Sequence, residues 1–114
     1  MLLDELKSQR LSSVEFVQDY IQLHFDDYSM SLYNPVKITQ GSGSLQQEQS
    51  GFKDALCSLI NCIVRDVSYT QSDKVEVAFG GGSSVVVCIA DKDYSGPEAL
   101  LLRSHDPKAP MLVI

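Results

Sequence analysis

DKVEVAFGGGSSVVVCIA, residues 73–90, is the stretch of this sequence that decides the fold. In its first part Val75, Val77 and Phe79 alternate with residues that are polar or small, a period of two that is typical of a half-buried strand. Glycines and serines follow, and residues 85–90 are then apolar on both faces. The stretch therefore predicts a β-hairpin whose second strand lies deep in a sheet.

The composition is that of one small globular domain spanning residues 1–114. Hydrophobic residues make up 44% of the chain and charged residues 21%, both ordinary values for such a domain. No apolar run approaches the roughly 18 residues of a membrane span, and the N-terminus lacks a signal-peptide pattern. We therefore expect a cytoplasmic protein with no membrane partner.

The net charge is −6, with nine basic residues scattered among fifteen acidic ones. Nucleic-acid binding needs clustered Lys and Arg to meet the phosphates, so this balance argues against a nucleic-acid partner. An acidic surface favours solubility and would suit a basic partner.

The three cysteines are expected to be reduced and mostly buried. Cys57 and Cys62 point apart on a predicted helix, and Cys88 lies in a run of valines.

Periodicity predicts a mixture of short helices and strands. Residues 40–50 (QGSGSLQQEQS) are rich in Gly, Ser and Gln, which predicts a flexible surface loop joining two halves. Residues 36–38 extend an edge strand, and residues 98–103 form either a helical turn or an edge strand. The other expected elements are helices over 2–9 and 51–62, strands over 14–17, 20–25, 29–33 and 63–69, and a C-terminal strand over 111–114.

The two halves resemble each other. Leu2 and Leu6 match Phe52 and Leu56 at an offset of 50 residues, and residues 19–25 match 73–79 at an offset of 54. This predicts an internal duplication with sub-repeats at about 1–39 and 51–91. The fold class expected is α+β: two αβββ units that share a mostly antiparallel sheet or a partly closed barrel, plus the C-terminal strand.

Three segments of the chain resemble a family of small uncharacterised bacterial proteins of unknown function. These segments are VEFVQDYIQLHF (14–25), FKDALCSLI (52–60) and YSGPEA (94–99). The resemblance implies a bacterial cytosolic source, but no activity, cofactor or catalytic residue. In size and acidity the chain is also similar to immunity proteins that neutralise toxins, which is an analogy only.

Asp91, Asp93 and the following Ser-Gly begin like a calcium-binding loop. Such a loop needs a bidentate Glu at position twelve, where this chain has Leu102, while Glu98 stands at position eight. A turn is therefore favoured over a weak divalent-cation site. The alternative function, a small-molecule or divalent-ion binding module, would use Asp91, Asp93, Tyr94 and Glu98.

No catalytic constellation is apparent. The three consecutive glycines lie between two strands, where a phosphate-binding loop would need a following helix. His24 is expected to face solvent, His105 lies in a loop beside Asp106, and nothing in the sequence pairs either histidine with Cys88. We expect no enzyme activity, no cofactor and no metal site.

Tyr20 and Tyr33, with His24, are expected on the outward faces of neighbouring strands. Exposed tyrosines bring large contact area at low entropic cost, unless another part of the chain covers them. The sequence therefore favours a non-catalytic protein–protein interaction module, acting on another protein or on itself as a homodimer.

Overall fold

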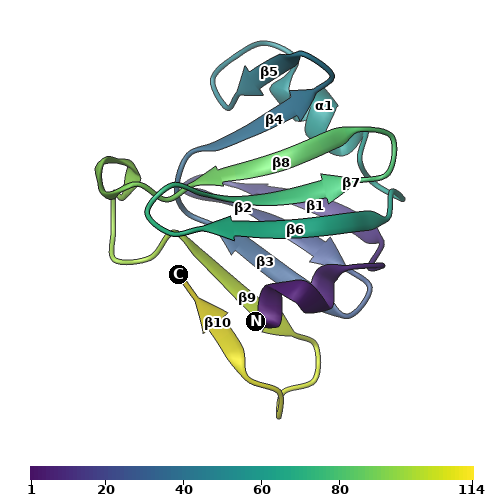
Figure 1. Cartoon of the computed structure of the whole chain (residues 1–114), viewed down its shortest axis with the longest axis vertical. Coiled ribbons are helices and arrows are strands. Elements are labelled where there is room, and N and C mark those ends of the chain that lie inside the picture. Colours follow the sequence, from purple (N-terminus) through teal and green to yellow (C-terminus); the bar gives the residue numbers. More distant parts are fainter.

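The structure is a computed structural model that describes all residues, 1–114, and it is mostly β. Ten strands form two five-stranded antiparallel sheets (Figure 1). The first sheet has the order β1-β2-β3-β9-β10, and the second has the order β5-β4-β8-β7-β6. The strands are β1 (Leu11–Val17), β2 (Tyr20–Phe25), β3 (Tyr28–Leu32), β4 (Val36–Gln40), β5 (Gly43–Gln46), β6 (Val64–Thr70), β7 (Lys74–Phe79), β8 (Ser83–Cys88), β9 (Leu100–Ser104) and β10 (Met111–Val113).

The expected α+β class with a shared sheet or partly closed barrel is wrong. The two sheets are separate and form no closed barrel, and the only α-helix is α1 (Phe52–Cys57). The expected helix over 51–62 ends at Cys57, after which Leu59 and Ile60 make i→i−3 turn bonds in place of helical ones. Asn61 then adopts a positive φ of 79°, and its N–H donates to the carbonyl of Leu11. The first expected helix is a short 3₁₀ helix, Leu2–Leu6.

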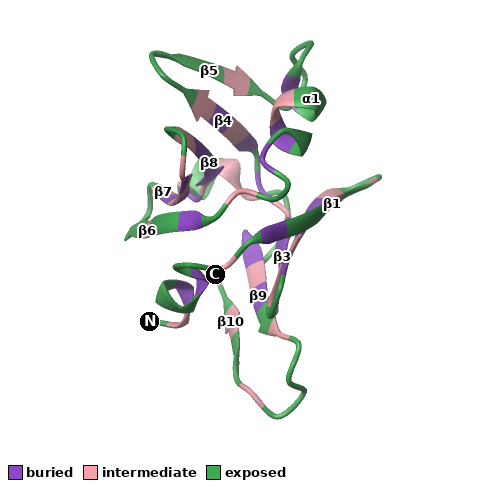
Figure 2. Ribbon diagram, turned by 90° about the vertical axis from the view of Figure 1, so that its right-hand side faces the viewer, coloured by how far each residue is buried: buried purple, intermediate pink, exposed green.

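The inner faces of both sheets pack into one continuous hydrophobic core. Alternation along β2 and β7 gives the same burial pattern, with every second residue buried. The 3₁₀ helix Leu2–Leu6 contacts β6 and β10, while α1 contacts β1 and β4. Figure 2 shows the two sheets apart on either side of the core. Each helix therefore covers one open end between the sheets.

The two sheets are joined where β1 and β6 begin. Arg10 and Ile63 form an isolated antiparallel bridge. Leu11 N donates to the carbonyl of Cys62 at 3.0 Å, and Val64 N donates to the carbonyl of Gln9 at 2.9 Å. Beyond this short joint the two edge strands diverge into their own sheets.

Equivalent positions on either side of this joint are 53 residues apart. The buried residues Leu3 and Leu6 of the first half occupy the places of Leu56 and Leu59 in the second. Both β1–β2 and β6–β7 carry a register shift near the start of the first strand. This spacing differs by three residues from the offset of 50 that the sequence suggests for the helices, and duplication stays a prediction.

β4 crosses from the first half of the chain into the second sheet. Asn34 makes the crossing: its side chain is only 2% exposed, and its Nδ2 donates to the carbonyl of Cys88 at 2.9 Å. β4 is therefore an interior strand between β5 and β8, not an edge strand. The segment 40–50, expected to be a flexible loop, contains a strand instead: β5 turns back on β4 and pairs with it.

Residues 98–103 were expected to form a helical turn or an edge strand, but β9 is an interior strand between β3 and β10. β10 lies where the sequence places a C-terminal strand and forms the outer edge of the first sheet. No helix of the structure has the length and apolarity needed to cross a membrane.

Candidate functional site

The outer face of the first sheet brings together the three expected contact residues. Tyr20, His24 and Tyr33 alternate with the buried inner residues and lie on this face. We call the outward-pointing side chains of this sheet the contact face. Its members are Ser13, Glu15, Val17, Tyr20, Gln22, His24, Ser29, Ser31, Tyr33, Leu101, Arg103, Met111 and Val113.

Tyr20 and Tyr33 form an aromatic pair on the contact face. Their ring centroids lie 5.4 Å apart, and the ring planes are tilted by 47°. Tilted pairs at this distance are favourable and hold both rings in place. The two tyrosines are half-buried, so each still presents an edge to solvent. The pair is therefore a fixed aromatic element at one end of the face.

A chain of polar contacts runs across the other end of the contact face. His24 Nε2 lies 3.1 Å from Glu15 Oε1, and His24 Nδ1 lies 2.9 Å from Ser29 Oγ. Ser29 Oγ also lies 3.0 Å from His105 Nε2. His105 Nδ1 in turn lies 3.2 Å from the carbonyl oxygen of Asp26. The expected solvent-facing His24 is thus 28% exposed at its side chain and held on both ring nitrogens.

Hydrogen counting shows which charge state completes this chain. The four contacts need four hydrogens, because the oxygens at both ends, those of Glu15 and Asp26, can only accept. With both imidazoles neutral, only three hydrogens are available, one each from His24, His105 and Ser29. All four contacts form only if at least one imidazole is protonated. The carboxylate of Glu15 is mostly exposed, so its ion pair with His24 contributes little to stability. The four contacts therefore form one connected polar surface.

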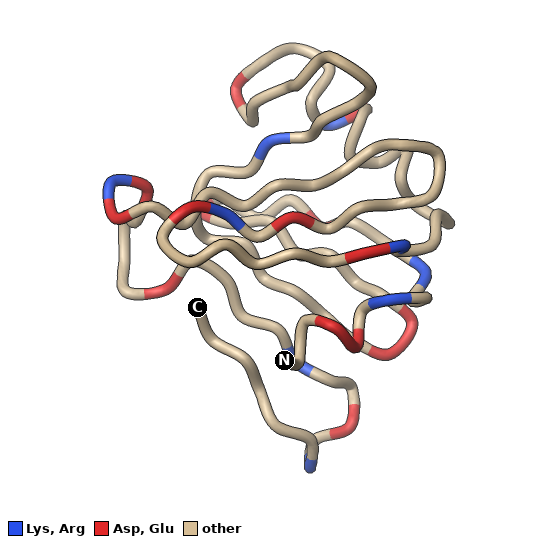
Figure 3. The backbone as a smooth tube through the Cα atoms, in the orientation of Figure 1, with Lys and Arg blue, Asp and Glu red and all other residues tan.

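The edge of the contact face is apolar. On β10, Met111 is 58% exposed and Val113 is 51% exposed. Leu101 on β9 lies directly opposite Val113 and points to the same side. Figure 2 shows exposed residues along β10 at the rim of the molecule, and Figure 3 shows that this strand carries no charge.

The outer face of the second sheet has a different character. Its cross-strand pairs are polar or charged at most positions, as for Ser68 with Glu76 and Thr70 with Lys74. Lys74 Nζ lies 3.6 Å from Glu76 Oε1 along the same strand. The exposed apolar side chains are therefore a property of the first sheet's outer face and not of sheet surfaces in this protein generally.

The other expected site residues lie in the loop between β8 and β9. Asp91–Asp93 forms a short 3₁₀ helix, and Asp93 Oδ2 accepts a hydrogen bond from the backbone N–H of Ala90 at 3.2 Å. Tyr94 packs its ring against the core, and Glu98 is half-buried farther along. No group of three His, Cys, Asp or Glu side chains in the protein is arranged to hold a metal ion. The loop therefore reads as a capped turn.

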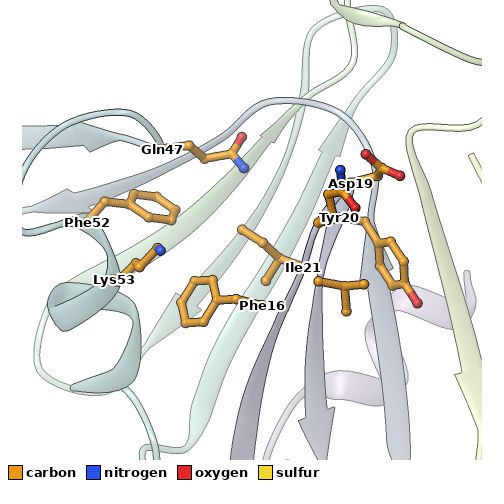
Figure 4. A pocket seen from close by; sticks show the side chains of 9 residues that line it. Phe16, Asp19, Tyr20, Ile21, Gln47, Phe52 and Lys53 are labelled. Carbon is orange, nitrogen blue, oxygen red and sulfur yellow. The ribbon is translucent and has the colours of Figure 1, made fainter.

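A cavity of about 420 Å³ lies between the β1–β2 turn and α1 (Figure 4). Phe16, Ile21 and Phe52 form its apolar wall. Lys53 Nζ lies 5.6 Å from the centroid of the Phe16 ring. Gln47 and Asp19 line its polar parts.

The comparisons with known proteins give no further guide. No protein family, curated protein or solved structure matches this chain. Its own geometry must therefore carry the functional interpretation.

Sequence reasoning missed the contacts of Glu15, Ser29 and His105. The contact of Ser29 with His24 could have been predicted from the sequence, because the two-residue turn Asp26-Asp27 places these residues opposite each other in a hairpin. His105 had no such signal, since it is 76 residues from Ser29 and reaches it only through the β3–β9 pairing.

Proposed function

We propose that this protein is a non-catalytic interaction module that self-associates through β10 and the adjoining contact face. The single observation that carries the proposal is the pair of exposed apolar residues Met111 and Val113, 58% and 51% exposed, on a strand that is hydrogen-bonded on one side only. Exposed apolar side chains beside an unpaired strand edge are characteristic of a surface that another strand covers.

The hydrogen-bond pattern of β10 determines which groups are unpaired. Leu100 and Ile114 exchange backbone hydrogen bonds in both directions. Hydrogen-bonded pairs alternate along an antiparallel ladder, so the backbone N–H and C=O groups of Leu112 also point toward β9. The N–H and C=O groups of Met111 and Val113 therefore point away from β9. These are the groups that a further strand would meet.

A second copy fits this edge with two-fold symmetry. If β10 of one copy runs antiparallel to β10 of the other, with Leu112 opposite Leu112, Met111 of each copy pairs with Val113 of the other. All the outward backbone groups of both residues are then satisfied. The opposed Met and Val side chains also cover each other on the outer face, which adds apolar burial.

The other edge strands fit this role less well. β1 carries Glu15, and β6 carries Arg65 and Asp66, all exposed charges of the kind that discourage strand pairing. β5 is a short Gly-Ser-Leu-Gln segment that presents little apolar surface. Because β10 is itself only three residues long, the interface is small and the dimer is expected to dissociate in the micromolar range.

A charged substitution tests the proposal. Val113→Lys places a charge in the symmetric strand pair and is expected to weaken the dimer about tenfold, equivalent to about 1.4 kcal/mol. Ser44→Lys is the matched control, because Ser44 is an exposed outward residue on β5, the outer edge strand of the other sheet. Sedimentation velocity over a range of concentrations measures both.

Two results would contradict the proposal. The first is a wild-type chain that stays monomeric at several hundred micromolar. The second is a dimer that Val113→Lys leaves as tight as the Ser44→Lys control does, which would place the interface elsewhere.

A further inference from the structure

We propose that the cavity between the β1–β2 turn and α1 binds a short peptide with free termini and an apolar side chain. The site adjoins one end of the contact face, with which it shares Val17 and Tyr20, but it includes no residue of β10 and does not depend on self-association. Its volume of about 420 Å³ lies within the range of small-ligand sites, about 300–1,000 Å³.

The cavity offers three kinds of surface in one place. Phe16 has a ring that is 38% exposed although it lies on the inner side of β1, so an apolar group can cover it. Lys53 supplies an ammonium group near this ring and pairs with no carboxylate in the structure. Asp19 supplies a carboxylate that is likewise unpaired.

The two charges lie on opposite sides of the cavity. Figure 4 shows Lys53 beside Phe52 and Phe16 on one side, and Asp19 beside Tyr20 on the other. A ligand with one negative and one positive end, joined by an apolar middle, therefore matches the order of charge, aromatic surface and charge. A ligand with only negative charge would be repelled by the carboxylate of Asp19, and one with only positive charge would be repelled by Lys53.

The volume of the cavity indicates the size of the ligand. About 420 Å³ lies within the range of small-ligand sites, which leaves room for two or three residues and is not filled by a single amino acid.

One more group, Gln47, lies beside Phe52 on the same side of the cavity as Lys53 (Figure 4). The Oε1 atom of Gln47 accepts a hydrogen bond from the backbone N–H of Val36 at 2.7 Å, which fixes the amide. Its NH₂ group remains as a donor for a peptide carbonyl. Lys53 would then receive the carboxyl end of the ligand and Asp19 the amino end.

The test uses the full chain and the tripeptide alanyl-phenylalanyl-alanine. A ¹H–¹⁵N titration is expected to shift the backbone signals of the cavity residues, with a dissociation constant near the millimolar range. Amidating the carboxyl end or acetylating the amino end is expected to weaken binding about two- to fivefold, within the range of exposed charge pairs. Free phenylalanine is expected to bind more weakly than the tripeptide.

Substitutions assign each end of the peptide. In Lys53→Gln the amidated and unmodified peptides should bind equally, and in Asp19→Asn the acetylated and unmodified peptides should do so. Lys92→Gln and Asp26→Asn, which change exposed charges outside the cavity, should behave as wild type.

Three outcomes would overturn the proposal. These are no shift of the cavity signals at tens of millimolar peptide, equal binding of the blocked and free peptides to the wild-type chain, and an unchanged preference in Lys53→Gln and Asp19→Asn. None of them bears on the oligomeric state, so the two proposals fail separately.

Discussion

Arg10 and Ile63 form the bridge that joins the two sheets, and they are 53 residues apart in the chain. The same separation relates the two non-glycine residues with positive φ that precede them, Ser8 at 73° and Asn61 at 79°. Ser8 N donates to the carbonyl of Val64 at 2.9 Å, and Asn61 N donates to the carbonyl of Leu11 at 2.7 Å. Both left-handed residues thus turn the chain from a helix into the joint.

The left-handed conformation at Ser8 predicts a distinctive substitution pattern. Ser8→Val is expected to lower the free energy of unfolding by about 1–2 kcal/mol, because a β-branched residue is strained at positive φ. Ser8→Gly should cost nothing, since glycine adopts this region freely. Urea unfolding measures both, and Ser68→Val on the exposed side of β6 is the control. Equal stability of the valine and glycine variants at position 8 would contradict the assignment.

Two core phenylalanines at the ends of corresponding strands are expected to contribute equally to the free energy of unfolding. Phe25 and Phe79 end β2 and β7 and are 1% and 2% exposed. Replacing either with Ala should lower the free energy of unfolding by about 3–5 kcal/mol. Phe16→Ala should cost clearly less, because that ring is 38% exposed. Chemical denaturation of the three variants tests this order, and a Phe16→Ala cost equal to the other two would be inconsistent with the packing.

The histidine contacts on the contact face are expected to depend on the hydroxyl of Ser29. When one imidazole is protonated, Glu15, His24, Ser29 and His105 can keep all their contacts. When both are neutral, one contact must break. Ser29→Ala removes the hydroxyl that both rings contact, so ¹⁵N spectra at one fixed pH should show changed signals for both imidazole rings. Ring signals that Ser29→Ala leaves unchanged would contradict these contacts.

The three cysteines should differ in reactivity. All are free thiols, as the sequence indicates, but Cys57 is exposed and only Cys62 and Cys88 are partly covered. Burial raises the pKa of Cys88, with Asp93 adding to the effect, which lowers the reactivity of this thiol. Timed alkylation with peptide mapping should modify Cys57 well before Cys88. The reverse order would contradict the structure.

Local patterns explain which elements could be predicted. The strands at 20–25 and 74–79 follow from alternation, because each has one buried and one outward face that a period of two reveals. The outward positions of Tyr20 and His24 follow from the same alternation. What leaves no local signal is pairing between distant segments, such as β4 entering the second sheet or β9 lying beside β3.

Two wrong expectations have specific physical causes. Leu59, Ile60 and Ile63 continue the spacing of a helix, yet Leu59 and Ile60 form a tighter turn with i→i−3 hydrogen bonds, and Ile63 lies in the bridge between the sheets. The Gly, Ser and Gln residues of 43–46 have low strand propensity, but the exposed edge next to β4 gives their backbone partners. Tertiary pairing decided both segments.

Site-specific cross-linking tests the central claim, self-association through β10, most directly. In the symmetric pairing the two Leu112 residues face each other across the two-fold axis, at a Cα separation of about 4.5 Å, which a disulfide bridges. The two Val113 residues lie about 8 Å apart and cannot be bridged. In a Cys57→Ser background, Leu112→Cys should therefore form a disulfide dimer under mild oxidation and Val113→Cys should not. No cross-link at position 112, or equal cross-linking at both positions, would contradict the account.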